Sequence, residues 1–121
     1  MGEWSKDMSK VIHEFNDIIR KLRKDCFGKG PERIHTIFVE NMAIAKLYGN
    51  LTPTERFIAS TDEGKEIVHS ARTKMIQDMY AASPPANMEA LIGAKFVHLF
   101  SDMKIEEDLA VSVFIFDKNI T

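Results

Sequence analysis

The sequence predicts an α+β fold: a four-stranded antiparallel sheet of two β-hairpins, with three to four helices packed mainly on one face, in the order α-ββ-αα(α)-ββ. Two observations predict it. Long segments carry apolar residues at three- and four-residue steps, as one face of a helix does, and shorter segments alternate apolar with other residues, as a strand does. The alternating segments come in two pairs, and strands that arrive as hairpins favour an antiparallel sheet. The 121 residues, 45% of them hydrophobic, suffice for a single domain over 1–121.

Residues 5–26 are expected to form an amphipathic helix, because charged residues occupy the positions between regularly spaced apolar ones. Gly28-Lys29-Gly30-Pro31 ends this helix, since glycine adopts left-handed backbone angles and proline cannot continue a helix. The expected apolar stripe consists of Trp4, Met8, Val11, Ile12, Phe15, Ile18, Ile19, Leu22 and Cys26. The basic residues near the helix end are interpreted as cations that a helix C-terminus favours, with contact to an acidic partner or to lipid headgroups as the alternative. They are Arg20, Lys21, Arg23, Lys24 and Lys29.

Residues 32–48 are expected to form the first hairpin, with its turn at Glu40-Asn41, because asparagine tolerates left-handed backbone angles. The glycine that usually follows asparagine in such a turn is absent, so one long bent strand is the alternative. One side of the first strand carries Ile34, Thr36 and Phe38, and the other side carries His35, Ile37 and Val39.

A short helix is expected to begin at Leu51-Thr52-Pro53-Thr54-Glu55. Thr52 is a typical capping residue, Pro53 suits the first turn, and Glu55 stands where it completes a capping box with Thr52. This segment is the sharpest local signal in the chain.

A longer helix is expected over residues 62–81, starting at Thr61-Asp62-Glu63 and ending at Ser83-Pro84-Pro85. Its expected buried stripe consists of Ile67, Val68, Ala71, Met75, Ile76 and Met79.

The last third of the chain is expected to hold one more short helix and the second hairpin. Asn87 caps the helix, which runs through Leu91 and is closed by Gly93. The hairpin covers residues 94–117, with its turn within Lys104–Asp108. In its first strand Phe96, His98 and Phe100 alternate with Val97 and Leu99; in its second strand Leu109, Val111, Val113 and Ile115 alternate with Ala110, Ser112, Phe114 and Phe116.

Composition and charge exclude several classes of function. The net charge of −2 provides no general attraction to nucleic acid or to an anionic membrane. Cys26 is the single cysteine, so no intrachain disulfide forms, and a reducing, cytoplasmic compartment fits. The chain does not begin like a signal peptide, and no apolar run approaches the roughly 20 residues of a membrane span. We expect no partner among nucleic acids and no direct membrane insertion.

No residue pattern predicts catalysis. His35 and His98 lie on different expected hairpins, and a metal site that includes Glu40 or Asp102 is one interpretation. Two partly buried histidines bonded to their neighbours are the favoured interpretation, because no HxH or HExxH spacing is present. Ser101-Asp102 and the other serines lack the G-x-S-x-G pattern of a nucleophile elbow. We expect no catalytic residue, no metal and no cofactor.

The apolar stripes predict self-association. The seven methionines fill irregular cores or adaptable contact surfaces. Together with the apolar residues of the first helix, the stripes exceed what one small sheet can cover. We therefore expect a homodimer with twofold symmetry.

Four stretches resemble the MpsC-like family. They are Gly49-Asn50-Leu51-Thr52-Pro53-Thr54-Glu55-Arg56; Glu63-Gly64 with Val68 and Arg72; Gly93 with Val97 and Ser101-Asp102; and Val113-Phe114-Ile115-Phe116. The resemblance implies a small bacterial protein that works beside the membrane components of a sodium-translocating, membrane-potential-generating system linked to bicarbonate uptake. Many members have an aspartate where this chain has Glu40-Asn41, and the family supplies no settled catalytic residues.

The motif positions also have structural interpretations. Thr52 and Glu55 cap a helix, Gly64 allows close packing, and Arg72 pairs with a carboxylate such as Asp102 or Glu55.

Three functions are in competition. The first is an accessory subunit without catalysis that docks on subunits of a membrane transport complex and is held at the membrane by them. The second is a regulatory module that binds a small anion near Arg56, Arg72, His98 and Asp102. The third, an enzyme, is the least supported, because no nucleophile has a recognisable base.

Overall fold

The computed structural model describes residues 2–120, and the side chains of residues 8–120. The elements are α1 (Gly2–Phe27), β1 (Arg33–Val39), β2 (Met42–Tyr48), α2 (Pro53–Ile58), α3 (Asp62–Ala82), α4 (Ala86–Ile92), β3 (Phe96–Lys104), the 3₁₀ turn η1 (Ile105–Glu107) and β4 (Leu109–Phe116). The predicted α+β class and the order of elements are confirmed. The Trp4 side chain, part of the expected stripe, lies outside the described side chains.

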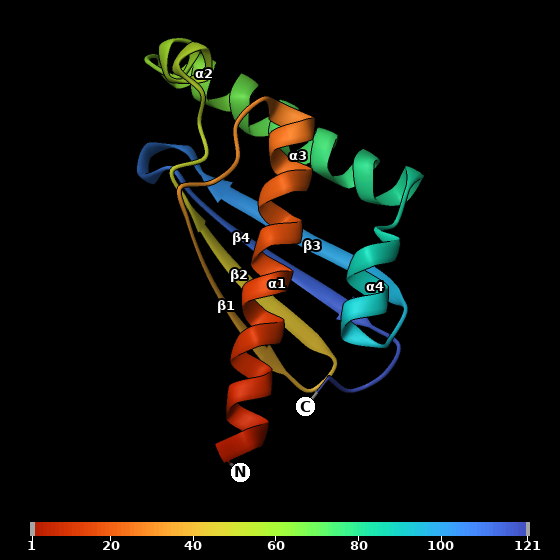
Figure 1. Ribbon diagram of the computed structural model, residues 1–121. Helices are drawn as coiled ribbons and strands as arrows, with labels where there is room; N and C mark the ends of the chain where they lie inside the picture. The colour runs from red at the N-terminus through yellow and green to blue at the C-terminus, as the bar shows by residue number, and fades with distance from the viewer. Residues whose placement is uncertain (1, 121) are drawn as a thin grey trace.

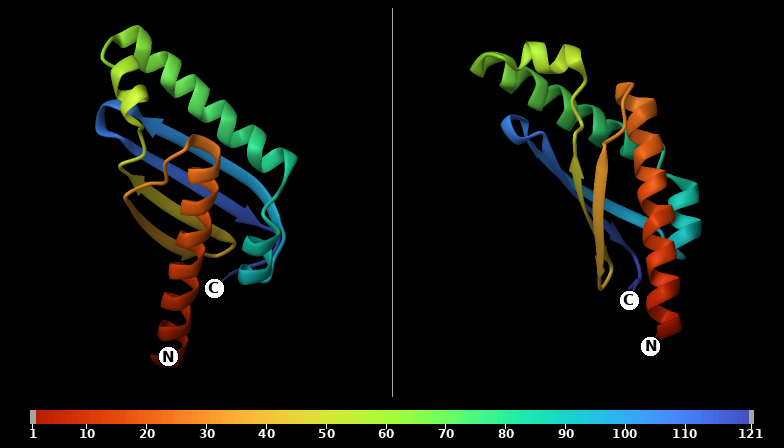
Figure 2. Two further views of the ribbon diagram at one scale, coloured as in Figure 1. Left: turned by 45° about the horizontal axis from the view of Figure 1, so that its top comes forward. Right: turned by 60° about the vertical axis from the view of Figure 1, so that its left-hand side comes forward.

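The two hairpins join into one antiparallel sheet with the strand order β1-β2-β4-β3 (Figure 1). The second strand of each hairpin is therefore central, and β1 and β3 are the edges. α1, α3 and α4 lie on the same face, and the edge-on view of Figure 2 shows the opposite face without a helix. The prediction of helices mainly on one face is confirmed.

The core lies between this helical layer and the sheet. Phe15 of α1 packs edge-on against Phe38 of β1 and Phe114 of β4, with ring centroids 5.6 and 5.3 Å apart. Tyr80 of α3 meets the same Phe114 ring at 5.6 Å. The alternation predicted for β4 is confirmed, with Ala110, Ser112, Phe114 and Phe116 buried.

The first hairpin turns at Glu40-Asn41, as predicted, but the residue with left-handed backbone angles is Glu40, with φ 56°. Asn41 contributes in another way. Its side-chain amide donates to the carbonyl of Phe116, and its own carbonyl accepts from the Phe116 amide. The side chain thus ties the turn to the end of β4.

The predicted stripe of α3 is wrong in three of its members. Ile67 and Met75 are 57% and 44% exposed, and Ala71 is exposed as well. The residues that the helix buries follow a strict four-residue step: Gly64, Val68, Arg72, Ile76 and Tyr80. This face includes an arginine and a glycine, so hydrophobicity alone does not reveal it.

Gly64 permits the close approach of α2 and α3. A Cβ atom at this position would lie 1.6 Å from the carbonyl oxygen of Ile58. The close packing predicted for Gly64 is confirmed.

Two further local predictions are corrected. The N-cap of α4 is Pro85, not Asn87, whose side-chain oxygen accepts from the neighbouring Met88 amide inside the helix. In β3 a bulge at Val97 shifts the alternation, so that Phe96 and Leu99 face the core while His98 and Phe100 face outward. The extra residue of a bulge reverses the side on which every following side chain points.

No helix among the described residues has both the length and the hydropathy of a membrane span.

Candidate functional site

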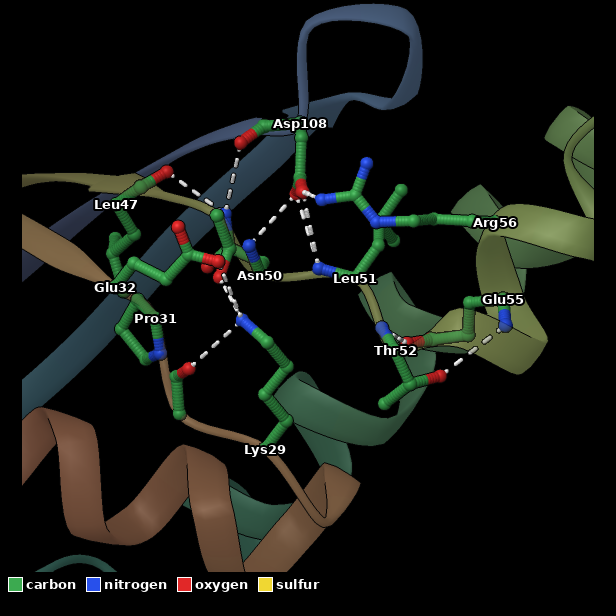
Figure 3. A network of polar contacts seen from close by, with 12 residues as sticks. Lys29, Pro31, Glu32, Leu47, Asn50, Leu51, Thr52, Glu55, Arg56 and Asp108 are labelled. Carbon is green, nitrogen blue, oxygen red and sulfur yellow. Dashed lines mark hydrogen bonds and ion pairs between the residues drawn. The ribbon is translucent and has the colours of Figure 1, made fainter.

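Asp108 connects the tip of the second hairpin to the loop before α2 by hydrogen bonds. It sits between η1 and β4 with left-handed backbone angles, φ 49°. Its carboxylate accepts from the backbone amides of Asn50 at 2.8 Å and Leu51 at 3.1 Å, and from the Arg56 guanidinium at 2.9 Å (Figure 3). The loop before α2 is thereby attached to the tip of the second hairpin.

The next part of this network joins α2 to α3. The predicted capping box is present: the Thr52 hydroxyl accepts from the Glu55 amide, and the Glu55 carboxylate accepts from the Thr52 amide. Arg72 donates to both Glu55 oxygens at 2.7 Å and to the carbonyl of Asn50 at 2.8 Å. Its guanidinium also lies 4.1 Å from the centre of the Phe27 ring. The predicted pairing of Arg72 is confirmed, and its partner is Glu55.

The electrostatics of Glu55 reflect this pairing. Burial acts to raise the pKa of the carboxyl group, but hydrogen bonds from Arg72 and Thr52 outweigh it, so the pKa of Glu55 lies below its usual value. Lys29 completes the network by donating to the carbonyl of Gly49 and contacting Glu32 at 3.4 Å (Figure 3). The cations in this network are thus occupied by protein oxygens.

Asp102 belongs to a second cluster. It accepts from the backbone amide of Met103 and lies 2.7 Å from His69 of α3. The hydrogen bond with His69, followed by the one from Met103, lowers the pKa of Asp102. The pair borders an open groove of about 410 Å³ that also contains Lys65, Glu66, Ser70, Lys104 and Glu106. The groove mixes both signs of charge, which favours no single class of ligand.

His98 lies apart from both clusters. It faces outward on β3, with its ring centroid 6.3 Å from that of Phe100. The four residues predicted to bind an anion are therefore distributed over three places: Arg56 and Arg72 share one network, Asp102 borders the groove, and His98 lies on the uncovered face.

The positions of the histidines and serines bear on the metal and nucleophile interpretations. His35 is on edge strand β1 and His98 on edge strand β3, so two strands separate them. Among the described residues no three histidine, cysteine or acidic side chains gather as a metal site would require. The hydroxyls of Ser101 and Ser112 are 2.9 Å apart and bond to each other.

Arg23 was not recognised from the sequence as part of a site. Arg23 belongs to α1, and its side chain is only 5% exposed, unlike that of the neighbouring Lys24. It donates to the Ser112 hydroxyl at 3.2 Å, and burial lowers its pKa to about 10. The one sequence feature that indicates a buried polar partner is Ser112, a polar residue at the centre of the inner face of β4.

The face of the sheet opposite the helices, which we call the open face, presents apolar side chains to solvent. Two rows across the strands are almost entirely apolar: Ile37-Ile44-Val113-Phe100 and Val39-Met42-Ile115-His98. Two further rows are mixed: His35-Lys46-Val111-Asp102 and Arg33-Tyr48-Leu109-Lys104. Phe100 and Ile37 are 60% and 47% exposed, so the apolar rows are in contact with solvent.

The comparisons with known proteins agree with the residues quoted above. A model of the family described as Na+-translocating membrane potential-generating system (MpsC) matches residues 8–118. Uncharacterized protein YrhF of Bacillus subtilis (strain 168) is 70% identical over 113 residues, which cover 93% of each chain. Uncharacterized protein YbcI of the same organism is 26% identical over 72 residues, 60% of this chain and 58% of its own. No solved structure matches the chain.

Proposed function

The chain belongs to the family of the Na+-translocating membrane potential-generating system (MpsC), and from this premise we propose that it is an accessory subunit of such a system. In this role it acts through protein contacts, as a homodimer, without a reaction of its own. The open face is the observation that carries the proposal.

A continuous apolar area of this kind favours a protein contact. Strands about 4.8 Å apart and residues about 3.3 Å apart give the open face a projected area of about 400 Å². This projected area is about half of the roughly 800 Å² that each partner contributes to a standard interface, and projecting side chains add to it. The largest apolar patch of a typical monomeric protein is about 300–600 Å² and is often a site of interaction.

The pattern of the open face favours a second copy as the occupant. A twofold axis parallel to the strands, between β2 and β4, places β1 of one copy over β3 of the other. Each row then meets the same row: Ile44 lies opposite Val113, and Ile37 lies opposite Phe100.

The charged ends of the mixed rows do not decide between arrangements. With this axis Asp102 of one copy lies opposite His35 of the other, whereas Arg33 lies opposite Lys104. A twofold axis across the strands instead lays apolar rows on mixed rows, which buries charge without a partner. The first arrangement is therefore favoured.

The helical side remains free in such a dimer. Phe57 of α2 is 80% exposed and Ile67 of α3 is 57% exposed. We assign the contact with the membrane-bound components to this side, which places the protein at the membrane through a partner. We also propose a finer role, the support of bicarbonate uptake, through this contact with the membrane-bound components.

The experiment uses a bacterium that lacks this chain. The Na+-dependent part of the membrane potential, measured with a potential-sensitive dye, is expected to fall and to return when the wild-type chain is supplied. Val113→Glu places a charge in the centre of the open face and is expected not to restore it, whereas Val113→Thr keeps the shape of the side chain and is expected to restore most of it.

An unchanged Na+-dependent potential in the strain without the chain would refute the accessory role. Growth at ambient carbon dioxide, with and without added bicarbonate, tests the finer proposal. A growth defect that added bicarbonate does not relieve would contradict it.

A further inference from the structure

Arg23 is a buried cation without an anionic partner. Of its five N–H donors, one has a protein acceptor, the hydroxyl of Ser112. Among the described residues, no carboxylate is one of the groups that act on the charge of Arg23. Removing a lone charge from water is costly unless an opposite charge accompanies it, and a well-packed apolar side chain is often the more stable choice.

The ionisable groups around Arg23 do not supply the missing charge. They are Arg72, Tyr80 and Cys26. Arg72 is a second cation, and the one carboxylate it binds is Glu55. Burial raises the pKa of Tyr80 and of Cys26, so both are neutral at pH 7.

Arg23 borders a narrow slot between α3 and the sheet. Its volume is about 10 Å³, which is room for one particle of the size of a water molecule or a small ion. The polar lining residues are Arg23, Arg72, Thr73, Ser101 and Asp102, and the others are Ile76, Met103 and Ala110. Asp102 also lines the slot, and its carboxylate binds His69.

The hydroxyl groups of Ser101 and Thr73, which line the slot, are able to donate to a ligand there. Ser112 accepts from Arg23 and lies 2.9 Å from the hydroxyl of Ser101. When the Ser112 hydroxyl donates the hydrogen bond to Ser101, the Ser101 hydroxyl is free to donate to another acceptor. Donors directed to one small space, beside an uncompensated positive charge, suit an anion better than a water molecule, which brings no charge.

We propose that this slot binds one small monovalent anion of about the size of chloride, held by Arg23 and by the hydroxyls of Ser101 and Thr73. This proposal does not depend on the accessory role. It retains Arg72 and Asp102 from the anion site predicted from the sequence, while Arg56 and His98 do not border the slot.

The test measures the melting temperature of the full chain in sodium gluconate, with chloride or bromide replacing gluconate at constant ionic strength. The wild type is expected to show a saturable rise of about 5 °C at ten times the dissociation constant. Arg23→Met is expected to lose this response. Lys24→Met removes the same charge from the neighbouring, exposed position and is expected to keep it.

A second measurement does not depend on any variant. Crystals of the wild type in sodium bromide are expected to show an anomalous scattering peak in the slot, within hydrogen-bond distance of the Arg23 guanidinium. An identical halide response in wild type and Arg23→Met, or a slot that holds water and no bromide, would overturn the proposal.

Discussion

Arg72 and Glu55 are joined by two hydrogen bonds of 2.7 Å, one to each carboxylate oxygen. The residues stand on different helices, and Glu55 at the same time caps the helix that carries it. The same guanidinium holds the carbonyl of Asn50 in the loop that Asp108 clips to the second hairpin. One side chain therefore fixes α2, α3 and the loop between the two halves of the sheet, with each of its acceptors buried or partly buried.

Arg72→Met is expected to lower the free energy of unfolding by about 3–5 kcal/mol, because it leaves the Glu55 carboxylate without its cation. Urea unfolding at pH 7 measures the change. Lys74→Met on the exposed side of α3 is the matched control and is expected to change stability by less than about 0.5 kcal/mol. A loss below about 1 kcal/mol for Arg72→Met would show that Arg72 does not hold the junction.

The lowered pKa of Glu55 predicts acid sensitivity. Its carboxylate is bound in the folded state, so its contribution to stability is complete above the unfolded pKa of about 4.5 and is lost as the pH falls through the lower pKa of the folded state. Glu55→Gln is expected to reduce stability at pH 7 and to flatten its decline below pH 5. Urea unfolding between pH 7 and 3 gives the comparison, with exposed Glu66→Gln as control. Parallel curves for wild type and Glu55→Gln would contradict the prediction.

Local chemistry made much of the fold predictable from sequence. The capping box at Thr52 and Glu55, and the turn at Glu40-Asn41, depend on residues close in the chain, and both are present. For Arg72 the sequence offered two carboxylate partners, Asp102 and Glu55, and the packing of α2 against α3 selects Glu55. The strand order was not predictable, since hairpin patterns do not say which strands of two hairpins become neighbours.

The buried polar residues were hidden for a related reason. Arg23 resembles the exposed cations beside it, and its burial depends on β4 being central, so that Ser112 lies beneath α1. Ile67 and Met75 suggested a stripe because they are apolar, yet α3 contacts the sheet along a line that includes Gly64 and Arg72. Tertiary contacts decide which of these residues are buried, and the periodicity of apolar residues does not reveal those contacts.

Gly64→Ala is expected to destabilise the protein by about 3 kcal/mol or more, because a methyl group has no room beside the carbonyl of Ile58. Alanine has the higher helix propensity, so an effect of propensity alone has the opposite sign. Thermal unfolding measures the difference, and Glu66→Ala at an exposed position of the same helix provides the control. An unchanged or higher melting temperature for Gly64→Ala would mean that α2 and α3 separate more readily than their contact implies.

The proposed dimer makes a prediction about which residues meet across its axis. With the axis parallel to the strands, Ile44 of one copy faces Val113 of the other, because β2 and β4 are neighbours in the sheet. In a Cys26→Ser background, a mixture of Ile44→Cys and Val113→Cys proteins is therefore expected to form a disulfide-linked dimer rapidly under mild oxidation. Non-reducing gel electrophoresis measures it, and Lys74→Cys on exposed α3 is the control for random collision.

The competing arrangement predicts a different pair. An axis across the strands places β2 over β2 of the second copy, with the order of the rows inverted. In that arrangement Ile44→Cys forms a disulfide with Lys46→Cys instead. The apolar rows have less contact with each other in that arrangement, which is why we expect the first pair to react faster. A monomeric mass by light scattering at micromolar concentration, with neither pair cross-linking faster than the Lys74→Cys control, would leave the open face without a second copy and refute the dimer.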